Sequence, residues 1–203
     1  MQIARILKEG HLGLARTACL LGGALWGAYW IPLRGLDAAG FSGALATGVA
    51  HGIPALALLP LMLVRHKSLR NGGIPLQAMG ATMGLAMLLY STAFLYTDVV
   101  RAVLVYYLTP VWGALFARLW LGEPITQDRV FGIALGIAGM LTIFSIDQGL
   151  PLPRNPGDWM ALSSGAIWAL AATLTRRYPK QPAIDMVSSW LVWASIFAIV
   201  AAL

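Results

Sequence analysis

The stretch GALWGAYWIPLRG (residues 23–35) returns later in the chain as GAIWALAATLTRR (residues 165–177). A constant offset of 142 positions aligns Gly23 with Gly165, Ala24 with Ala166, Trp26 with Trp168 and Arg34 with Arg176. Between the two copies lies the most proline-rich connection of the chain, DQGLPLPRNPGD (147–158). The recurrence predicts two related units, a first at 1–149 and the start of a second at 150–203.

The composition indicates that these units lie in a membrane. Hydrophobic residues make up 59% of the 203 residues, charged residues only 11%, and the mean hydropathy is +0.74. A soluble domain carries about 25% charged residues, so this chain lacks the charge to coat one. The formal net charge is +6, but the basic residues lie in short clusters between apolar runs. Loops facing an anionic lipid leaflet have this distribution, and we expect no binding to nucleic acid.

Seven apolar runs are long enough to cross a bilayer as helices, which takes roughly 17–25 residues. They cover residues 17–33, 43–64, 75–96, 102–121, 130–146, 159–175 and 185–203. Isolated runs must satisfy their backbone hydrogen bonds within themselves in lipid, and only helices do so. The sequence therefore predicts an all-α integral membrane protein.

The number of runs that precede the second copy gives its direction relative to the first. Five runs precede the connection 147–158, and five is odd, so the second copy enters the membrane in the opposite sense to the first. Such an inverted-topology repeat is typical of secondary transporters, which use the near symmetry for alternating access.

The basic residues predict the orientation. With the N-terminus in the cytoplasm, eleven of the 14 Lys and Arg residues fall on the cytoplasmic side. The three on the other side are Arg34, Arg101 and Arg154. By the positive-inside rule we expect a multi-pass protein of the plasma (inner) membrane with a cytoplasmic N-terminus.

The run YYLTPVWGALFARLWLGEPIT (106–126), followed by RVFGIALGIAGMLTIF (129–144), resembles the EamA-type transporters of the drug/metabolite transporter superfamily. The shared features are the mid-helix Pro110, the terminal Gly122–Glu123 and the glycine face of Gly132, Gly136 and Gly139. The resemblance implies ten helices in two five-helix repeats, of which this chain holds about seven. It also implies that the fourth helix lines a central cavity and that the glycine face of the fifth packs on the fourth.

Aromatic residues are the first candidates for substrate contacts. Trp26 and Tyr29 are three residues apart and share one helix face. Trp168 repeats Trp26 in the second unit, and Tyr90 follows a methionine stripe on the third run. The alternative is an interfacial belt of Trp and Tyr, which anchors helices without binding substrate.

The fourth run adds Tyr106, Pro110 and Trp112 as candidates. Proline has no N–H, so Pro110 frees the carbonyl of Tyr106 and is expected to kink the helix. A freed carbonyl beside Tyr and Thr hydroxyls is suited to binding an ammonium or hydroxyl group.

His51, Arg118 and Glu123 are candidates for gating or proton coupling, and His51 is also a candidate for substrate binding. An ionisable residue inside a membrane is a functional hypothesis by default, and histidine titrates near neutral pH. The alternatives are a neutral His51 bonded to a carbonyl and an end-cap charge pair of Glu123, with Arg129 as a partner. Asp98 and Arg101 are expected to form a solvated pair in a short outer loop.

We therefore expect a secondary transporter, an exporter of small metabolites such as amino acids or amphipathic, cationic drug-like compounds. Its partners would be the lipid bilayer, the substrate and, through the candidates above, protons; a homodimer is left open. The alternative is a non-transporting protein, either a scaffold or a degenerate fragment. The sequence has no paired-acid, H-x-x-x-H or G-x-S-x-G pattern, so we expect neither catalysis nor a metal or cofactor.

Overall fold

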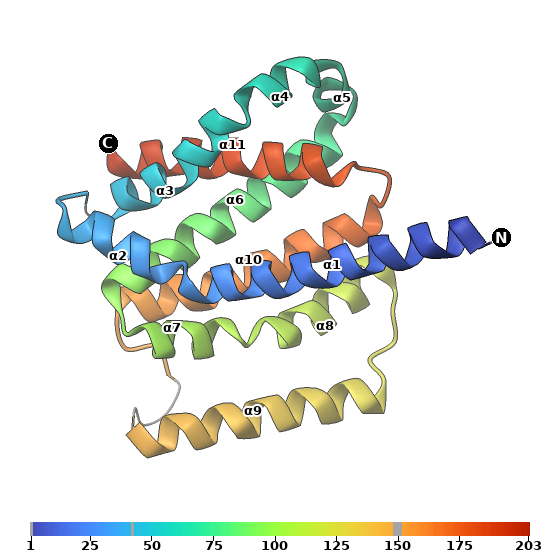
Figure 1. Ribbon diagram of the computed structural model, residues 1–203. Helices are drawn as coiled ribbons and strands as arrows, with labels where there is room; N and C mark the ends of the chain where they lie inside the picture. The colour runs from blue at the N-terminus through green and yellow to red at the C-terminus, as the bar shows by residue number, and fades with distance from the viewer. Residues whose placement is uncertain (1, 42, 148–151) are drawn as a thin grey trace.

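The computed structural model describes residues 2–41, 43–147 and 152–203, with side chains described over 12–41, 43–143 and 152–203. Within these ranges the chain forms helices and no strands (Figure 1). The helices are α1 (Gln2–Ala28), α2 (Trp30–Ala38), α3 (Ala44–Ala57), α4 (Leu59–Val64), α5 (His66–Asn71), α6 (Gly73–Tyr96), α7 (Val99–Tyr106), α8 (Thr109–Leu121), α9 (Gln127–Asp147), α10 (Pro156–Arg177) and α11 (Ala183–Ala202).

Each of the seven predicted runs corresponds to one helix or to a pair of consecutive helices. Among the described residues, three segments are long and apolar enough to cross a membrane by length and composition: Gly73–Tyr96, Val99–Leu121 and Ala183–Ala202. Many large apolar side chains on α1 and α9 are exposed, as suits a surface that faces lipid. The expectation of an all-α integral membrane protein is confirmed.

The breaks between α1 and α2 and between α7 and α8 lie next to prolines. The α1–α2 break at Tyr29 comes shortly before Pro32, and Pro110 is the second residue of α8. Proline lacks an N–H and clashes with the carbonyl four residues earlier, which kinks or breaks a helix. The predicted kink at Pro110 is present, but the freed carbonyl of Tyr106 is not vacant. It accepts a hydrogen bond from Thr109 Oγ1 at 2.5 Å.

Helix α6 lies at the centre, with α10 and α11 packed against it. Glycines allow this close approach, because a Cβ added at Gly84 would lie 2.6 Å from the backbone nitrogen of Ala194 on α11. A Cβ at Gly165 of α10 would lie 2.8 Å from the carbonyl oxygen of Tyr106. Small residues that bring backbones together are typical of helix packing in membranes.

Helix α9 lies apart from this core, alongside α8 (Figure 1). A Cβ added at Gly132, Gly136 or Gly139 would meet nothing within 4 Å. The expectation that this glycine face packs tightly on the fourth helix is therefore wrong for this structure. An apolar groove separates α9 from α7 and α8 instead.

Charged residues gather at the two ends of the bundle. At one end, which we call the Asp158 end, α6 stops and α10 begins. There Arg34 donates to the carbonyl oxygen of Phe94 at 3.1 Å, and Arg101 to Asp158 at 2.7 Å. At the opposite end, the Glu123 end, α10 stops and α11 begins. Arg34 and its repeat counterpart Arg176 lie at opposite ends, so α1–α2 and α10 run in opposite directions (Figure 1).

The expectation that Asp98 and Arg101 form a solvated pair is wrong. Asp98 caps α7 by accepting from the backbone N–H groups of Val100 and Arg101. The Arg101 side chain turns away from it and is buried against Asp158, which is itself fully buried. A buried charge needs a partner, and α10 supplies one here.

Candidate functional site

Four of the aromatic candidates form one continuous chain of ring contacts. Trp26 stacks on Tyr29 and on Tyr90, with centroid separations of 5.7 and 6.0 Å. Tyr90 meets Tyr106 at 4.6 Å. These residues come from α1, the α1–α2 break, α6 and α7, so the fold brings together rings that are far apart in sequence. We call these four residues the aromatic cluster.

His51 extends the aromatic cluster toward α11. Its ring lies 6.0 Å from Tyr29 and 5.7 Å from Trp190, edge to face in both cases. Its Nδ1 donates to the carbonyl oxygen of Thr47 at 2.9 Å, and the hydroxyls of Thr47 and Thr92 are 3.3 Å apart. His51 is therefore buried and hydrogen-bonded to a carbonyl, as the alternative interpretation of the sequence expected. A role in proton coupling remains a prediction.

A cavity of about 460 Å³ lies beside this cluster, between α7–α8 and α10, with the start of α9 at its edge. It brings Tyr106 and Pro110 of the predicted first unit together with Trp168 of the predicted second unit. Its walls are Tyr106, Tyr107, Thr109, Pro110, Gly113, Arg129, Ile133, Trp168, Ala169, Ala172, Thr173 and Arg176. We call it the α8–α10 pocket.

Few polar groups in the α8–α10 pocket remain available to a ligand. The hydroxyl of Thr109 donates to the carbonyl of Tyr106, and that of Thr173 donates to the carbonyl of Ala169 at 2.9 Å. The strongest remaining donors are the guanidinium groups of Arg129 and Arg176 at the Glu123 end. Ligand sites typically combine apolar walls with a few such polar groups.

Glu123 lies beside those two arginines. Gly122 ends α8 in the left-handed conformation, with φ of 69°, which glycine adopts without strain. Glu123 then pairs with Arg176, and its Oε2 lies 3.6 Å from Arg129 Nη1. The end-cap charge pair considered from the sequence therefore exists and includes a second arginine from α10.

Two other candidates lie outside the α8–α10 pocket. Trp112 stacks on Phe116 with centroids 6.4 Å apart, and its buried Nε1 has no hydrogen-bond partner among the residues that the structure describes. Arg118 is exposed and makes no ion pair with the residues whose side chains are described. A gating role for Arg118 or Glu123 remains a prediction.

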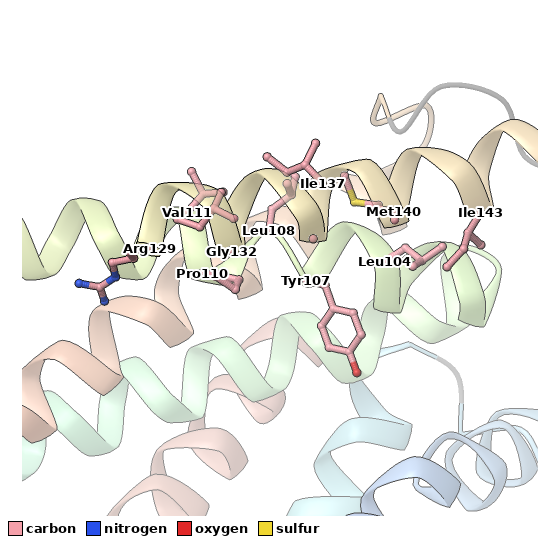
Figure 2. A pocket seen from close by; sticks show the side chains of 13 residues that line it. Leu104, Tyr107, Leu108, Pro110, Val111, Arg129, Gly132, Ile137, Met140 and Ile143 are labelled. Atoms are coloured by element: carbon pink, nitrogen blue, oxygen red, sulfur yellow. The ribbon is translucent and has the colours of Figure 1, made fainter. Parts of the chain in front are cut away.

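A larger cavity of about 640 Å³ is the groove between α7–α8 and α9 (Figure 2). Its walls are almost entirely apolar, and Figure 2 shows Arg129 at one end and Ile143 at the other. Tyr107 and Pro110 line both cavities. Because the groove offers so few groups to orient a ligand, we take the α8–α10 pocket as the candidate site.

Sequence reasoning missed the partners of several charged side chains. Arg65 donates to both carboxylate oxygens of Asp185, at 2.6 and 3.0 Å, and Ser68 to one of them. Arg176 could have been singled out from the sequence, because the repeat aligns it with Arg34. Nothing in the sequence joins Arg101 to Asp158, since their pairing depends on how α7 packs against α10.

Comparison with known protein families matches residues 14–145 to the EamA-like transporter family. The chain is 28% identical over 202 residues to the uncharacterized transporter YvbV of Bacillus subtilis (strain 168), covering 94% of this chain and 64% of that protein. It is 26% identical over 144 residues to YyaM of the same organism, also an uncharacterized transporter, covering 68% of this chain and 47% of that protein. The chain thus spans less than two thirds of the length of these relatives, and no solved structure matches it. As the resemblance in residues 106–144 implied, the chain belongs to the EamA-like transporter family.

Proposed function

We propose that this protein is a secondary transporter that exports small amphipathic metabolites by alternating access. Amino acids and amphipathic drug-like cations are the two substrate classes to test. The observation that carries the proposal is the α8–α10 pocket, because its walls come from both units and include the aromatic residues Tyr106 and Trp168. A site between two units can open to either side as one unit moves relative to the other.

The opposite directions of α1–α2 and α10 support the inverted repeat that this mechanism requires. Arg34 and Arg176 are aligned by the repeat and bind at opposite ends of the bundle. The helix breaks at Tyr29 and at Tyr107–Leu108 also support it, since interrupted helices are typical of substrate sites in transporters. In the proposed orientation the Glu123 end faces the cytoplasm.

Transport in inside-out vesicles tests the proposal. The labelled compounds would be L-phenylalanine, 3-phenylpropionate and 3-phenylpropylamine, with and without a pH gradient. An exporter accumulates at least one of them above protein-free vesicles. A correctly inserted protein that accumulates none of these compounds, and is not stabilised by any, would support the scaffold or degenerate fragment instead.

Proton coupling through His51 is a separate part of the proposal. His51→Gln keeps a side-chain N–H for the Thr47 carbonyl but cannot take up a proton. We expect the variant to lose the response to a pH gradient and to keep exchange without a gradient. An unchanged pH response would leave His51 as a packing residue.

A further inference from the structure

We propose that Arg129 and Arg176 form an anion subsite in the α8–α10 pocket, which binds the carboxylate of a monocarboxylic acid with an aromatic or apolar body. The inference rests on the proposed function, because it names the substrate class of the same pocket. If the subsite exists, the substrates are the carboxylate-bearing compounds and not the amphipathic cations.

The side chains of Glu123, Arg129 and Arg176 carry a net positive charge that one more anion would balance. Two guanidinium groups face the single carboxylate of Glu123, so this cluster keeps one unit of positive charge. Both arginines line the pocket, whereas Glu123 does not. A monocarboxylate bound inside the pocket would neutralise the cluster, while a dianion would leave it negative.

The two arginines also have hydrogen-bond donors to spare. A guanidinium carries several N–H donors in a planar fork that fits a carboxylate. Arg176 donates one of them to Glu123. The Arg129 guanidinium lies 3.6 Å from Glu123, too far for a hydrogen bond. A second carboxylate therefore finds donors on both residues without displacing Glu123.

The rest of the pocket fixes the body of the ligand. Trp168 and Arg176 lie about two turns apart on α10, or about 12 Å along its axis. The wall between them consists of Ala169, Ala172 and Thr173, and Tyr106 and Ile133 face it from other helices. A carboxylate at Arg176 thus leaves an aromatic ring or a branched chain to lie along this apolar wall, on the side toward Trp168.

A cationic ligand finds no matching charge there. No Asp or Glu is among the described residues that line the pocket. The carbonyl of Tyr106, which helix breakage frees, already accepts from Thr109 and is covered by Gly165. An ammonium group entering the pocket would meet two guanidinium groups of its own sign.

Binding of two probes that differ in charge tests the subsite. The probes are 3-phenylpropionate and 3-phenylpropylamine, titrated calorimetrically against the purified protein in detergent. The variants are Arg129→Gln, Arg176→Gln, Glu123→Gln and Arg177→Gln. Arg177 is the matched control, because it follows Arg176 but donates to the Trp120 carbonyl and does not line the pocket.

We expect 3-phenylpropionate to bind and 3-phenylpropylamine not to. Arg176→Gln and Arg129→Gln should each weaken 3-phenylpropionate about tenfold, the loss of one charge-assisted contact. Arg177→Gln should leave its affinity within about twofold. Glu123→Gln breaks the same ion pair as Arg176→Gln but keeps the guanidinium, so it should bind as tightly as the unaltered protein or more tightly. This contrast separates loss of the anion subsite from loss of the ion pair.

Three results would overturn the subsite: no binding of 3-phenylpropionate, equal affinities in Arg176→Gln and Arg177→Gln, or preferred binding of the amine. Failure of the proposed transport function would give a different combination of binding and accumulation results. Arginine-dependent binding without accumulation in vesicles would reject the transporter and keep the subsite. Accumulation of the amine, unaffected by Arg176→Gln, would reject the subsite and keep the transporter.

Discussion

Two kinds of glycine occur in the helices, and the difference sets where single substitutions matter. At Gly165 a Cβ would lie 2.8 Å from the Tyr106 carbonyl oxygen and 2.9 Å from Thr109 Oγ1. At Gly136 a Cβ would meet nothing within 4 Å. The first glycine is needed for α10 to cross the α7–α8 break, while the second occupies a face that is open in this structure.

Gly165→Ala should therefore separate α10 from α7 and α8 and destabilise the protein by about 1–3 kcal/mol, the usual cost of overpacking. Gly136→Ala is the control, and we expect it to be neutral or stabilising by up to about 1 kcal/mol from helix propensity. Unfolding in detergent by a denaturant, followed by circular dichroism, measures both. Equal effects of the two substitutions would contradict the observed packing.

At the scale of elements, α10 and α11 begin in the same way. Each carries an aspartate three residues after its N-cap residue, Asp158 after Asn155 and Asp185 after Pro182. Each aspartate binds an arginine from earlier in the chain, Asp158 binding Arg101 at one end of the bundle and Asp185 binding Arg65 at the other. The surroundings differ, because the Arg101 side chain is 5% exposed and that of Arg65 is 32% exposed.

Asp158→Asn should be the more damaging of the two neutralisations. It removes the carboxylate charge that is buried against Arg101, and breaking such a buried ion pair typically costs about 3–5 kcal/mol. After Asp185→Asn, water can solvate Arg65, so the loss should be smaller. Denaturant unfolding of both variants in the same detergent gives the comparison. A loss in Asp185→Asn that equals or exceeds that in Asp158→Asn would mean that burial does not control these pairs.

The helical elements were the most predictable part of the fold. Composition and run length located the helices, and proline chemistry located the break near Pro110, because both depend on local sequence. The glycine face of α9 was predicted to be packed and is open, and Arg101 was predicted to be solvated and is buried. Both outcomes depend on which helices lie next to each other, which short-range patterns do not specify.

At the scale of the whole molecule, the three basic residues expected outside do gather at one end. Arg34, Arg101 and Arg154 all lie at the Asp158 end, near the last turn of α6 and the start of α10. The sequence also indicated Tyr106 and Pro110, through proline chemistry, and Trp168, through the repeat, and these three residues line one pocket. It did not indicate that Arg129 and Arg176 line the same pocket, since that follows only from the packing of α8, α9 and α10.

Cysteine labelling tests the proposed orientation. In a Cys19→Ser background, Leu152→Cys lies at the Asp158 end and Ile125→Cys in the connection between α8 and α9, and both positions are exposed. With the N-terminus in the cytoplasm, a membrane-impermeant maleimide should label Leu152→Cys on intact cells. Ile125→Cys should react only after permeabilisation, and the reverse pattern would invert the orientation.

The central claim is that substrate binds between the two units, in the α8–α10 pocket. Counterflow of labelled L-phenylalanine in proteoliposomes tests it most directly, with Trp168→Ala compared with Trp159→Ala. Trp159 is the matched control, because it is another α10 tryptophan but is 58% exposed and does not line the pocket. We expect Trp168→Ala to reduce counterflow about tenfold, the effect of losing about 1.4 kcal/mol of binding, and Trp159→Ala to leave it unchanged. Equal counterflow by the two variants, or none by the unaltered protein, would contradict the claim.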